Sequence, residues 1–222
     1  MRPERQLPLD LGHRPALGNE DFLVAPSNKT AVDWIDRWPD WPGTGLFLYG
    51  PPGSGKTHLA QVWLARANGV FFRAAGLSLA EPRAILAEGR ACVVEDAAAA
   101  DETALLHLHN ALVERKGHLL LTDREPPARW RIGLADLRSR LLALPAVWLA
   151  PPDDQLFAAV LVKLFNDCQL AVGEEVIGYL LSRTERSFAA ARDVVTALDK
   201  AALARRRRIT VPFVRETLGT GN

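Results

Sequence analysis

The sequence predicts an α/β domain with a parallel five-stranded sheet, followed by a small α-helical domain. Five short apolar segments alternate with helical patterns between residues 46 and 149, as is typical of parallel strands joined by crossover helices. The motif G-x-x-x-x-G-K-T joins the first strand to the next helix, and only helical patterns follow Pro151-Pro152. We therefore expect an extended tail over 1–21, an α/β domain over 22–150 and a helical domain over 151–222.

Composition and charge are those of an ordinary globular protein. The 222 residues are 48% apolar and 24% charged, and 27 Lys and Arg against 26 Asp and Glu give a formal net charge of +1. This balance gives no bulk electrostatic reason to bind nucleic acid. No apolar run reaches membrane-spanning length and the N-terminus lacks the apolar core of a signal peptide, so we expect a cytoplasmic protein with no membrane contact. Cys92 and Cys168 lack metal-ligand spacing and are expected to be buried.

The most specific motif is a phosphate-binding P-loop. It follows the apolar strand Leu46–Tyr49 and opens a helix that runs from His58 to Ala67. Glycines allow backbone N–H groups to converge on a phosphate, Lys56 pairs with the β- and γ-phosphates, and Thr57 offers a hydroxyl to Mg²⁺. We predict ADP or ATP with Mg²⁺, and reject an accidental turn because strand, loop and helix all occur in order. The expected nucleotide-binding residues of this stretch are Gly50, Pro51, Pro52, Gly53, Ser54, Gly55, Lys56, Thr57 and His58.

Polar residues end two later strands. The apolar run Ala91–Val94 is followed by Glu95 and Asp96, and such adjacent carboxylates can hold Mg²⁺ and polarise the attacking water. A solvated turn is the alternative. The strand His118–Thr122 ends at Asp123, and either Thr122 or Asp123 can sense the γ-phosphate, with a helix cap as the alternative.

Helix boundaries are predicted from caps and periodicity. Ser27 is expected to cap a helix that runs to about Arg37, and Asp101 to cap one that ends at Gly117. Further helices are expected at about 81–88, 154–168, 174–183, 187–204 and 211–218. The basic run Arg205–Arg208 lies at a helix C-terminus, where cations complement the helix dipole, so we favour a structural role over nucleic-acid contact.

Three leucines alternate in the tail. Leu7, Leu9 and Leu11 would lie on one side of an extended peptide, and Pro8 disfavours a helix there. From the residues alone, a partner's pocket and the protein's own surface are equally good places for these side chains.

These motifs together resemble the AAA+ ATPase family, and within it the DnaA-related branch with the layout of Hda. The resemblance rests on residues 22–28, GPPGSGKTHL at 50–59, LTDREPP at 121–127, LRSRL at 137–141, residues 192–198 and ITVPFVRETL at 209–218. It covers nearly the whole chain, and the combination of motifs is specific.

The resemblance implies roles for further residues. Leu23 and Val24 would lie near adenine, Arg192 would be the sensor 2 arginine, and sensor 1 would be Thr122 or Asp123. Arg140 matches the arginine finger, which would act in trans on ATP held by DnaA.

The resemblance also implies partners. The peptide QLPLDL is similar to the motif by which bacterial proteins dock on the sliding clamp, the β subunit of DNA polymerase III, and its contacts would be Gln6, Leu7, Leu9 and Leu11. The sequence ends at Asn222 with no segment matching a helix-turn-helix DNA-binding domain, so we expect DNA contact only indirectly through the clamp. Homodimer formation is left open.

The implied function is that of a clamp-associated negative regulator of replication initiation that promotes hydrolysis of DnaA-bound ATP. AAA+ enzymes have Asp followed by Glu in their acidic pair, whereas here Glu95 precedes Asp96. If Glu95 takes the metal position, Asp96 is too short to polarise water well, and if Asp96 takes it, no acidic residue follows. We therefore expect weak intrinsic ATPase activity. The alternative is an autonomous AAA+ ATPase that loads or remodels a replication protein.

Overall fold

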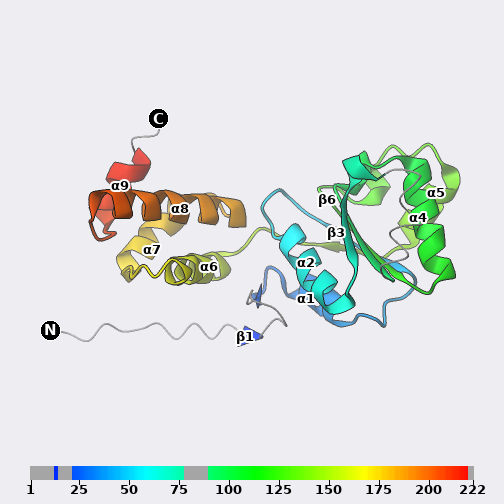
Figure 1. The fold of residues 1–222 in the computed structure, drawn as a ribbon, viewed down its shortest axis with the longest axis horizontal. Coiled ribbons are helices and arrows are strands. Elements are labelled where there is room, and N and C mark those ends of the chain that lie inside the picture. The colour runs from blue at the N-terminus through cyan, green and yellow to red at the C-terminus, as the bar shows by residue number, and fades with distance from the viewer. Residues whose placement is uncertain (1–12, 15–21, 78–89, 220–222) are drawn as a thin grey trace. The chain divides into compact units, whose positions relative to one another are not determined.

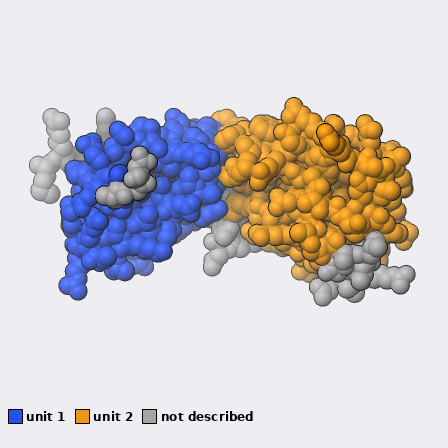
Figure 2. Space-filling view, turned by 90° about the horizontal axis from the view of Figure 1, so that it is seen from above, with its two compact units in different colours: residues 1–14, 23–25, 152–222 blue, residues 15–22, 26–151 orange. Residues whose placement is uncertain are grey.

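The computed structural model describes residues 13–14, 22–77 and 90–219, which divide into two compact units (Figures 1 and 2). The larger unit contains residues 26–151 and the smaller contains residues 152–219 together with Leu23–Ala25. The chain thus passes from one unit to the other at Pro151-Pro152.

A five-stranded parallel sheet forms the centre of the larger unit, in the order β4-β5-β6-β3-β7. Its strands are β3 (Gly45–Tyr49), β4 (Val70–Arg73), β5 (Ala91–Glu95), β6 (His118–Asp123) and β7 (Ala146–Trp148). The central strands are nearly continuous apolar runs because both faces of the sheet are covered. The predicted α/β fold with a parallel five-stranded sheet is confirmed. Two short strands, β1 (His13–Arg14) and β2 (Phe22–Leu23), form a separate sheet.

Helices cover both faces of the parallel sheet (Figure 1). On one face lie α1 (Lys29–Asp36) and α2 (Lys56–Ala67), and on the other lie α4 (Glu102–Glu114) and α5 (Ala135–Ala143). The face under α4 and α5 is a single apolar cluster that includes Phe47 and Leu121 of the sheet with Leu105, Leu108 and Leu137 of the helices. Three short 3-10 helices, η1 (Ala74–Gly76), η2 (Ala97–Ala99) and η3 (Pro127–Arg129), follow β4, β5 and β6.

The smaller unit is a helical lid with its own core. Its helices are α6 (Asp154–Asp167), α7 (Glu174–Leu181), α8 (Phe188–Arg205) and α9 (Val211–Gly219). The Asp153 and Ser187 side chains cap α6 and α8 by accepting backbone N–H groups. Inward-facing apolar residues of the four helices form one buried cluster, with Phe157, Leu161, Phe165, Leu180, Leu198 and Phe213 at its centre. The predicted helical lid is therefore confirmed.

Several local predictions are tested by the structure. Asp101 caps α4, because its Oδ1 accepts the Ala104 N–H at 2.8 Å. The prediction of Ser27 as a cap is wrong, since the turn continues through Asn28 and α1 begins at Lys29. Cys92 is buried as expected, but Cys168 is exposed because it ends α6, where the chain turns away from the core. The helix expected at 81–88 lies outside the described residues.

The basic run at the end of α8 is used inside the lid. Arg205 and Arg207 both pair with Glu216 of α9, at 2.6 and 3.2 Å, and both guanidinium groups lie over the Phe213 ring. This arrangement agrees with the structural role favoured from the sequence. Within the described residues, none of the helices combines the length and the apolar character needed to cross a bilayer.

Candidate functional site

The P-loop connects the end of β3 to the start of α2. Gly53 and Gly55 have φ values of 73° and 97°, which side chains with a Cβ rarely adopt. A Cβ at Gly50 would overlap the carbonyl oxygen of Leu149. Glycine is therefore required at these points for the loop to turn over the carboxyl edge of the sheet.

The loop carries donors that suit a polyphosphate. The first N–H groups of α2 have no acceptor within the helix, and the Ser54 hydroxyl is buried without a hydrogen-bond partner among the described residues. Lys56 Nζ donates to the carbonyl oxygens of Gly50 and Pro51, each at 2.8 Å. Burial lowers the pKa of Lys56, whereas the negative charges of Asp123 and Asp96 oppose that shift. A phosphate group placed here would accept from donors that the protein alone leaves unsatisfied.

Glu95 faces the P-loop at the end of β5. It is only 8% exposed, its Oε1 accepts the Thr57 hydroxyl, and its Oε2 lies 3.4 Å from Arg73 Nε. The register of the sheet brings Arg73 there, because β4 and β5 pair with Arg73 opposite Glu95. Thr57 and Glu95 thus lie together where a Mg²⁺ ion bound to phosphate would fit.

Asp96 is exposed where Glu95 is buried, although its charge still acts on Lys56. Its backbone is left-handed, with a φ of 56°, and its side chain is exposed at the turn into η2. Among the described residues, no group of three His, Cys, Asp or Glu could hold a metal. A metal ion at Thr57 and Glu95 would therefore depend on phosphate oxygens for its remaining ligands.

The end of β6 lies beside the P-loop. Thr122 is buried between Leu48 of β3 and Glu95 of β5 in the sheet register. The Asp123 carbonyl oxygen accepts the Gly50 N–H at 3.2 Å. Its carboxylate accepts the backbone N–H groups of Ala98 at 2.8 Å and Arg124 at 2.6 Å. Asp123 therefore ties the P-loop to the turn that follows Glu95.

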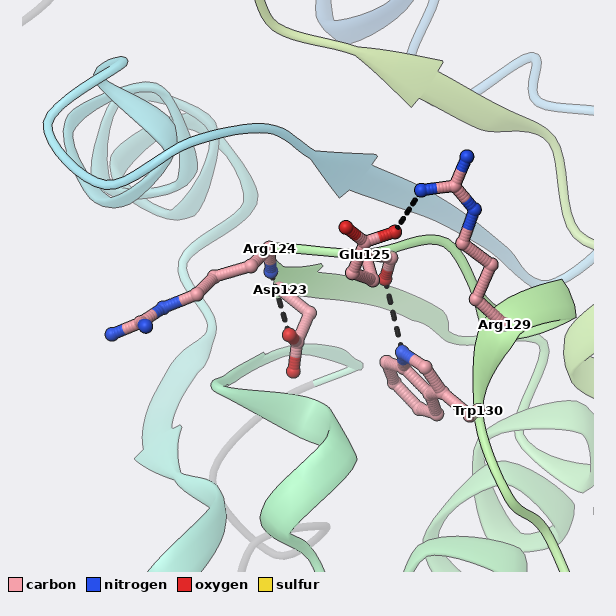
Figure 3. A network of polar contacts seen from close by, with 5 residues as sticks. All are labelled: Asp123, Arg124, Glu125, Arg129 and Trp130. Carbon is pink, nitrogen blue, oxygen red and sulfur yellow. Dashed lines mark hydrogen bonds and ion pairs between the residues drawn. The ribbon is translucent and has the colours of Figure 1, made fainter.

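The residues after Asp123 form a small polar network (Figure 3). Glu125 pairs with Arg129 at 2.6 Å, and its carbonyl oxygen accepts the Trp130 indole N–H at 3.0 Å. Arg124 extends away from this pair. Sequence reasoning missed Arg124 and Arg73, although each is a cation at the carboxyl end of a strand next to the predicted site.

Arg140 lies on α5, which covers the face of the sheet opposite to α2 (Figure 1). Its Nε donates to Asp136 Oδ1 at 2.9 Å. The start of α5 is held by the Glu102 carboxylate, which accepts the N–H groups of Gly133 and Leu134 at 2.9 and 2.7 Å. The structure thus separates Arg140 from the P-loop helix of its own sheet and attaches α5 firmly to α4.

The other residues predicted for the site are Leu23, Val24, Arg192, His58 and the leucines and glutamine of the tail. Leu23 and Val24 are half-buried and belong to the smaller unit, and Arg192 is exposed on α8. His58 follows Thr57 in the first turn of α2. Gln6, Leu7, Leu9 and Leu11 lie outside the described residues.

The fold is similar to that of solved AAA+ proteins. Domain III of the replication initiation protein DnaA from Thermotoga maritima matches with a TM-score of 0.74 and 17% identity, covering 90% of this chain and 94% of that one. AMPPCP-bound DnaA from Aquifex aeolicus matches with a TM-score of 0.68 and 20% identity, covering 82% of this chain and 64% of that one. The chain spans about two thirds of the length of DnaA chains solved with AMPPCP.

A protein with another activity shares the same fold. The RuvB Holliday junction branch migration motor of Thermotoga maritima matches with a TM-score of 0.71 and 14% identity, covering 87% of this chain and 68% of that one. At such identities the likeness shows the fold alone. The lid sequence is more informative about the family than the fold is, because residues 154–218 match the family model of the Hda lid domain. Residues 154–218 are thus an Hda-type lid, on a chain that has the AAA+ fold of DnaA domain III. The four helices α6 to α9 of the Hda-type lid span the matched segment.

Proposed function

We propose that the protein is a negative regulator of replication initiation that binds the sliding clamp and promotes hydrolysis of ATP bound to DnaA. In this role Arg140 supplies positive charge to the γ-phosphoryl group held in the DnaA site. Such a group in trans stabilises the charge that develops during phosphoryl transfer and contributes several orders of magnitude in rate in comparable systems. The family assignment of the lid supports DnaA as the partner.

The observation that carries the proposal is the position of Arg140 on α5, across the sheet from α2. A guanidinium there is suited to a phosphate on a neighbouring molecule and not to the phosphates of its own P-loop. Asp136 engages only the Nε of Arg140. The two terminal nitrogens have no hydrogen bond to the described residues and remain suited to bidentate contact with phosphate.

We further propose that the protein holds ADP or ATP as a structural ligand. Lys56 and the P-loop N–H groups would bind the phosphates, and Thr57 and Glu95 would hold Mg²⁺. When bound, Mg²⁺ would neutralise phosphate charge. Two observations support weak intrinsic hydrolysis. The Asp96 side chain is exposed, and Glu95 is paired with Arg73, so neither carboxylate is positioned as a base for the attacking water.

The remaining parts of the proposal concern the tail and the division of the chain. Gln6, Leu7, Leu9 and Leu11 would dock on the β subunit of DNA polymerase III, so DNA would be reached through the clamp. Residues 1–21 would act as a tether, 22–150 as the nucleotide-binding domain and 151–222 as the lid. We propose a cytoplasmic location, where these partners act.

A second candidate is an autonomous AAA+ ATPase that loads or remodels a replication protein. The observation in its favour is the complete P-loop, in which Lys56 is present and the Thr57 hydroxyl donates to Glu95. Brisk ATP turnover by the purified protein without DnaA would favour this candidate.

The test is the loss of DnaA-bound ATP in the presence of clamp loaded on DNA. We expect the wild-type protein to accelerate it, and both Arg140→Ala and the double variant Leu9→Ala/Leu11→Ala to fail. Arg140→Ala should retain clamp binding, whereas the double variant should lose it. Full activity of Arg140→Ala would contradict the proposal.

A further inference from the structure

Exposed arginines gather around the last helix of the lid, α9, which packs against α7 and α8 (Figure 1). They come from three parts of the lid: the turn after α7, the end of α8 with the residues that follow it, and α9 itself. We call this set the lid arginine group, and its members are Arg183, Arg205, Arg206, Arg207, Arg208 and Arg215.

Two members of the group stack on one tyrosine of α7. The guanidinium carbons of Arg183 and Arg215 lie 4.9 and 5.8 Å from the centre of the Tyr179 ring. A guanidinium over an aromatic ring is attracted by the electrons of the ring, and its N–H donors remain available at its edge. The Tyr179 ring thus holds two cations from different parts of the chain at the surface of the lid.

The basic run after α8 divides into two kinds of residue. Arg205 and Arg207 stack on Phe213 and share the carboxylate of Glu216, so both are used inside the lid. Arg206 and Arg208 alternate with them, are exposed, and form no ion pair with the described residues. The structural role of the run therefore accounts for only half of its charge.

The lid arginine group has a local excess of positive charge. Glu216 is the one carboxylate among the described residues that pairs with members of the group. The guanidinium groups of Arg183, Arg206, Arg208 and Arg215 have neither an ion pair nor a hydrogen bond within the described part of the chain. The excess is compatible with a formal net charge of only +1 for the protein, because attraction to a polyanion depends on local charge.

The coverage of the two rings favours one kind of polyanion. Proteins that bind single-stranded nucleic acid stack the bases on open aromatic side chains, and protein interfaces have an apolar and often aromatic centre. In the lid, guanidinium groups lie over the Tyr179 and Phe213 rings. The donors that remain are those suited to the phosphates of a nucleic-acid duplex, which are contacted from outside without stacking.

We propose that the lid arginine group binds the phosphate backbone of double-stranded DNA, with Arg183, Arg215, Arg206 and Arg208 as the contacting residues. This binding is independent of base sequence, since phosphate contacts carry no sequence information. It requires neither a nucleotide nor DnaA, and it adds a direct DNA contact to the indirect one proposed through the clamp.

The test is the affinity of the purified full-length protein for a short fluorescent DNA duplex, measured by anisotropy at several salt concentrations without clamp or DnaA. We expect Arg183→Gln/Arg215→Gln to weaken binding at low salt by about tenfold or more. The slope of log affinity against log salt concentration should become shallower by about 2, because each lost phosphate contact removes about 0.9 from it. Arg206→Gln/Arg208→Gln should have a similar effect.

The matched control is Arg131→Gln/Arg138→Gln, which removes the same charge from exposed arginines of the larger unit. It should bind the duplex with nearly the affinity and salt slope of the wild type. Circular dichroism should show unchanged helix content in all three variants, because every substituted side chain is exposed.

The inference is wrong if the wild-type protein does not bind the duplex at low salt, or if both lid variants bind it as the wild type does. Equal losses in the lid variants and the control would attribute binding to total charge and would also contradict it. If the lid variants keep their affinity for the duplex but lose affinity for the purified clamp, the group faces an acidic protein surface and not DNA.

Discussion

At the scale of single residues, the two adjacent carboxylates after β5 have different environments. The sequence leaves the register open, because Glu95 and Asp96 are consecutive and either could face the P-loop. The structure has Glu95 buried against Thr57 and Arg73, with Asp96 exposed in a left-handed turn. The sheet register decides this, and it depends on residues far apart in the sequence.

This difference predicts the effect of neutralising each carboxylate. The factor by which Mg²⁺ strengthens nucleotide binding should be about tenfold smaller in Glu95→Gln than in the wild type, because one charged metal ligand is lost. Asp96→Asn should leave this factor nearly unchanged. Titration of ADP binding at several Mg²⁺ concentrations measures both. A larger effect from Asp96→Asn than from Glu95→Gln would show that the assignment is reversed.

A second residue-scale prediction concerns His109 on α4. It is buried, with its Nδ1 lacking a hydrogen-bond partner among the described residues. Burial and the charge of Arg140 lower the pKa of His109 from 6.5, whereas Asn110 and Asp136 oppose the shift. The unfolded chain therefore takes up the proton more readily, so the stability contribution of the neutral ring is complete above pH 6.5 and is lost as the pH falls below it.

His109→Leu should make the free energy of unfolding less dependent on pH between about 7.5 and 5.5. Chemical denaturation followed by tryptophan fluorescence measures this, because all six tryptophans lie in residues 26–151 of the larger unit. His107→Ala is the control, since His107 is exposed on the same helix. An identical pH dependence in wild type and His109→Leu would exclude His109 as the source.

At the scale of elements, the boundaries of strands and helices follow from local patterns, but their attachments do not. The P-loop, the five strands and the lid helices could be predicted from the sequence, because apolar periodicity and caps such as Asp101 involve only a few consecutive residues. The contacts of Glu102 with Gly133 and Leu134 join residues 31 and 32 positions apart. No local pattern signals such contacts, and the ion pair of Arg73 with Glu95 escaped prediction for the same reason.

The attachment of α5 by Glu102 predicts an effect at a distance. Glu102→Gln should lower the free energy of unfolding of the larger unit by about 1–3 kcal/mol, because it weakens two charge-assisted hydrogen bonds to backbone N–H groups. It should also reduce stimulation of DnaA-bound ATP hydrolysis, since Arg140 is carried by α5. Glu114→Gln, exposed on the same α4 helix, is the control. A stable Glu102→Gln variant with normal stimulation would show that α5 is held by its apolar contacts alone.

At the scale of the whole molecule, the two units differ in how specifically they resemble known proteins. The larger unit has a fold shared with both DnaA and RuvB, so its architecture does not select an activity. The lid differs in this respect, because residues 154–218 match the family model of the Hda lid domain. A P-loop at the carboxyl edge of the sheet and Arg140 on the face opposite α2 support the proposal that the protein binds its own nucleotide while acting on that of a partner.

The most direct measurement of this division of roles follows two separately labelled pools of ATP, one bound to DnaA and one bound to this protein, in a single-turnover reaction with clamp on DNA. We predict that the DnaA-bound label is hydrolysed while the label on this protein persists, and that Arg140→Ala abolishes the first reaction while Arg138→Ala, an exposed neighbour on α5, does not. Hydrolysis of this protein's own label while that of DnaA persists would contradict the proposal.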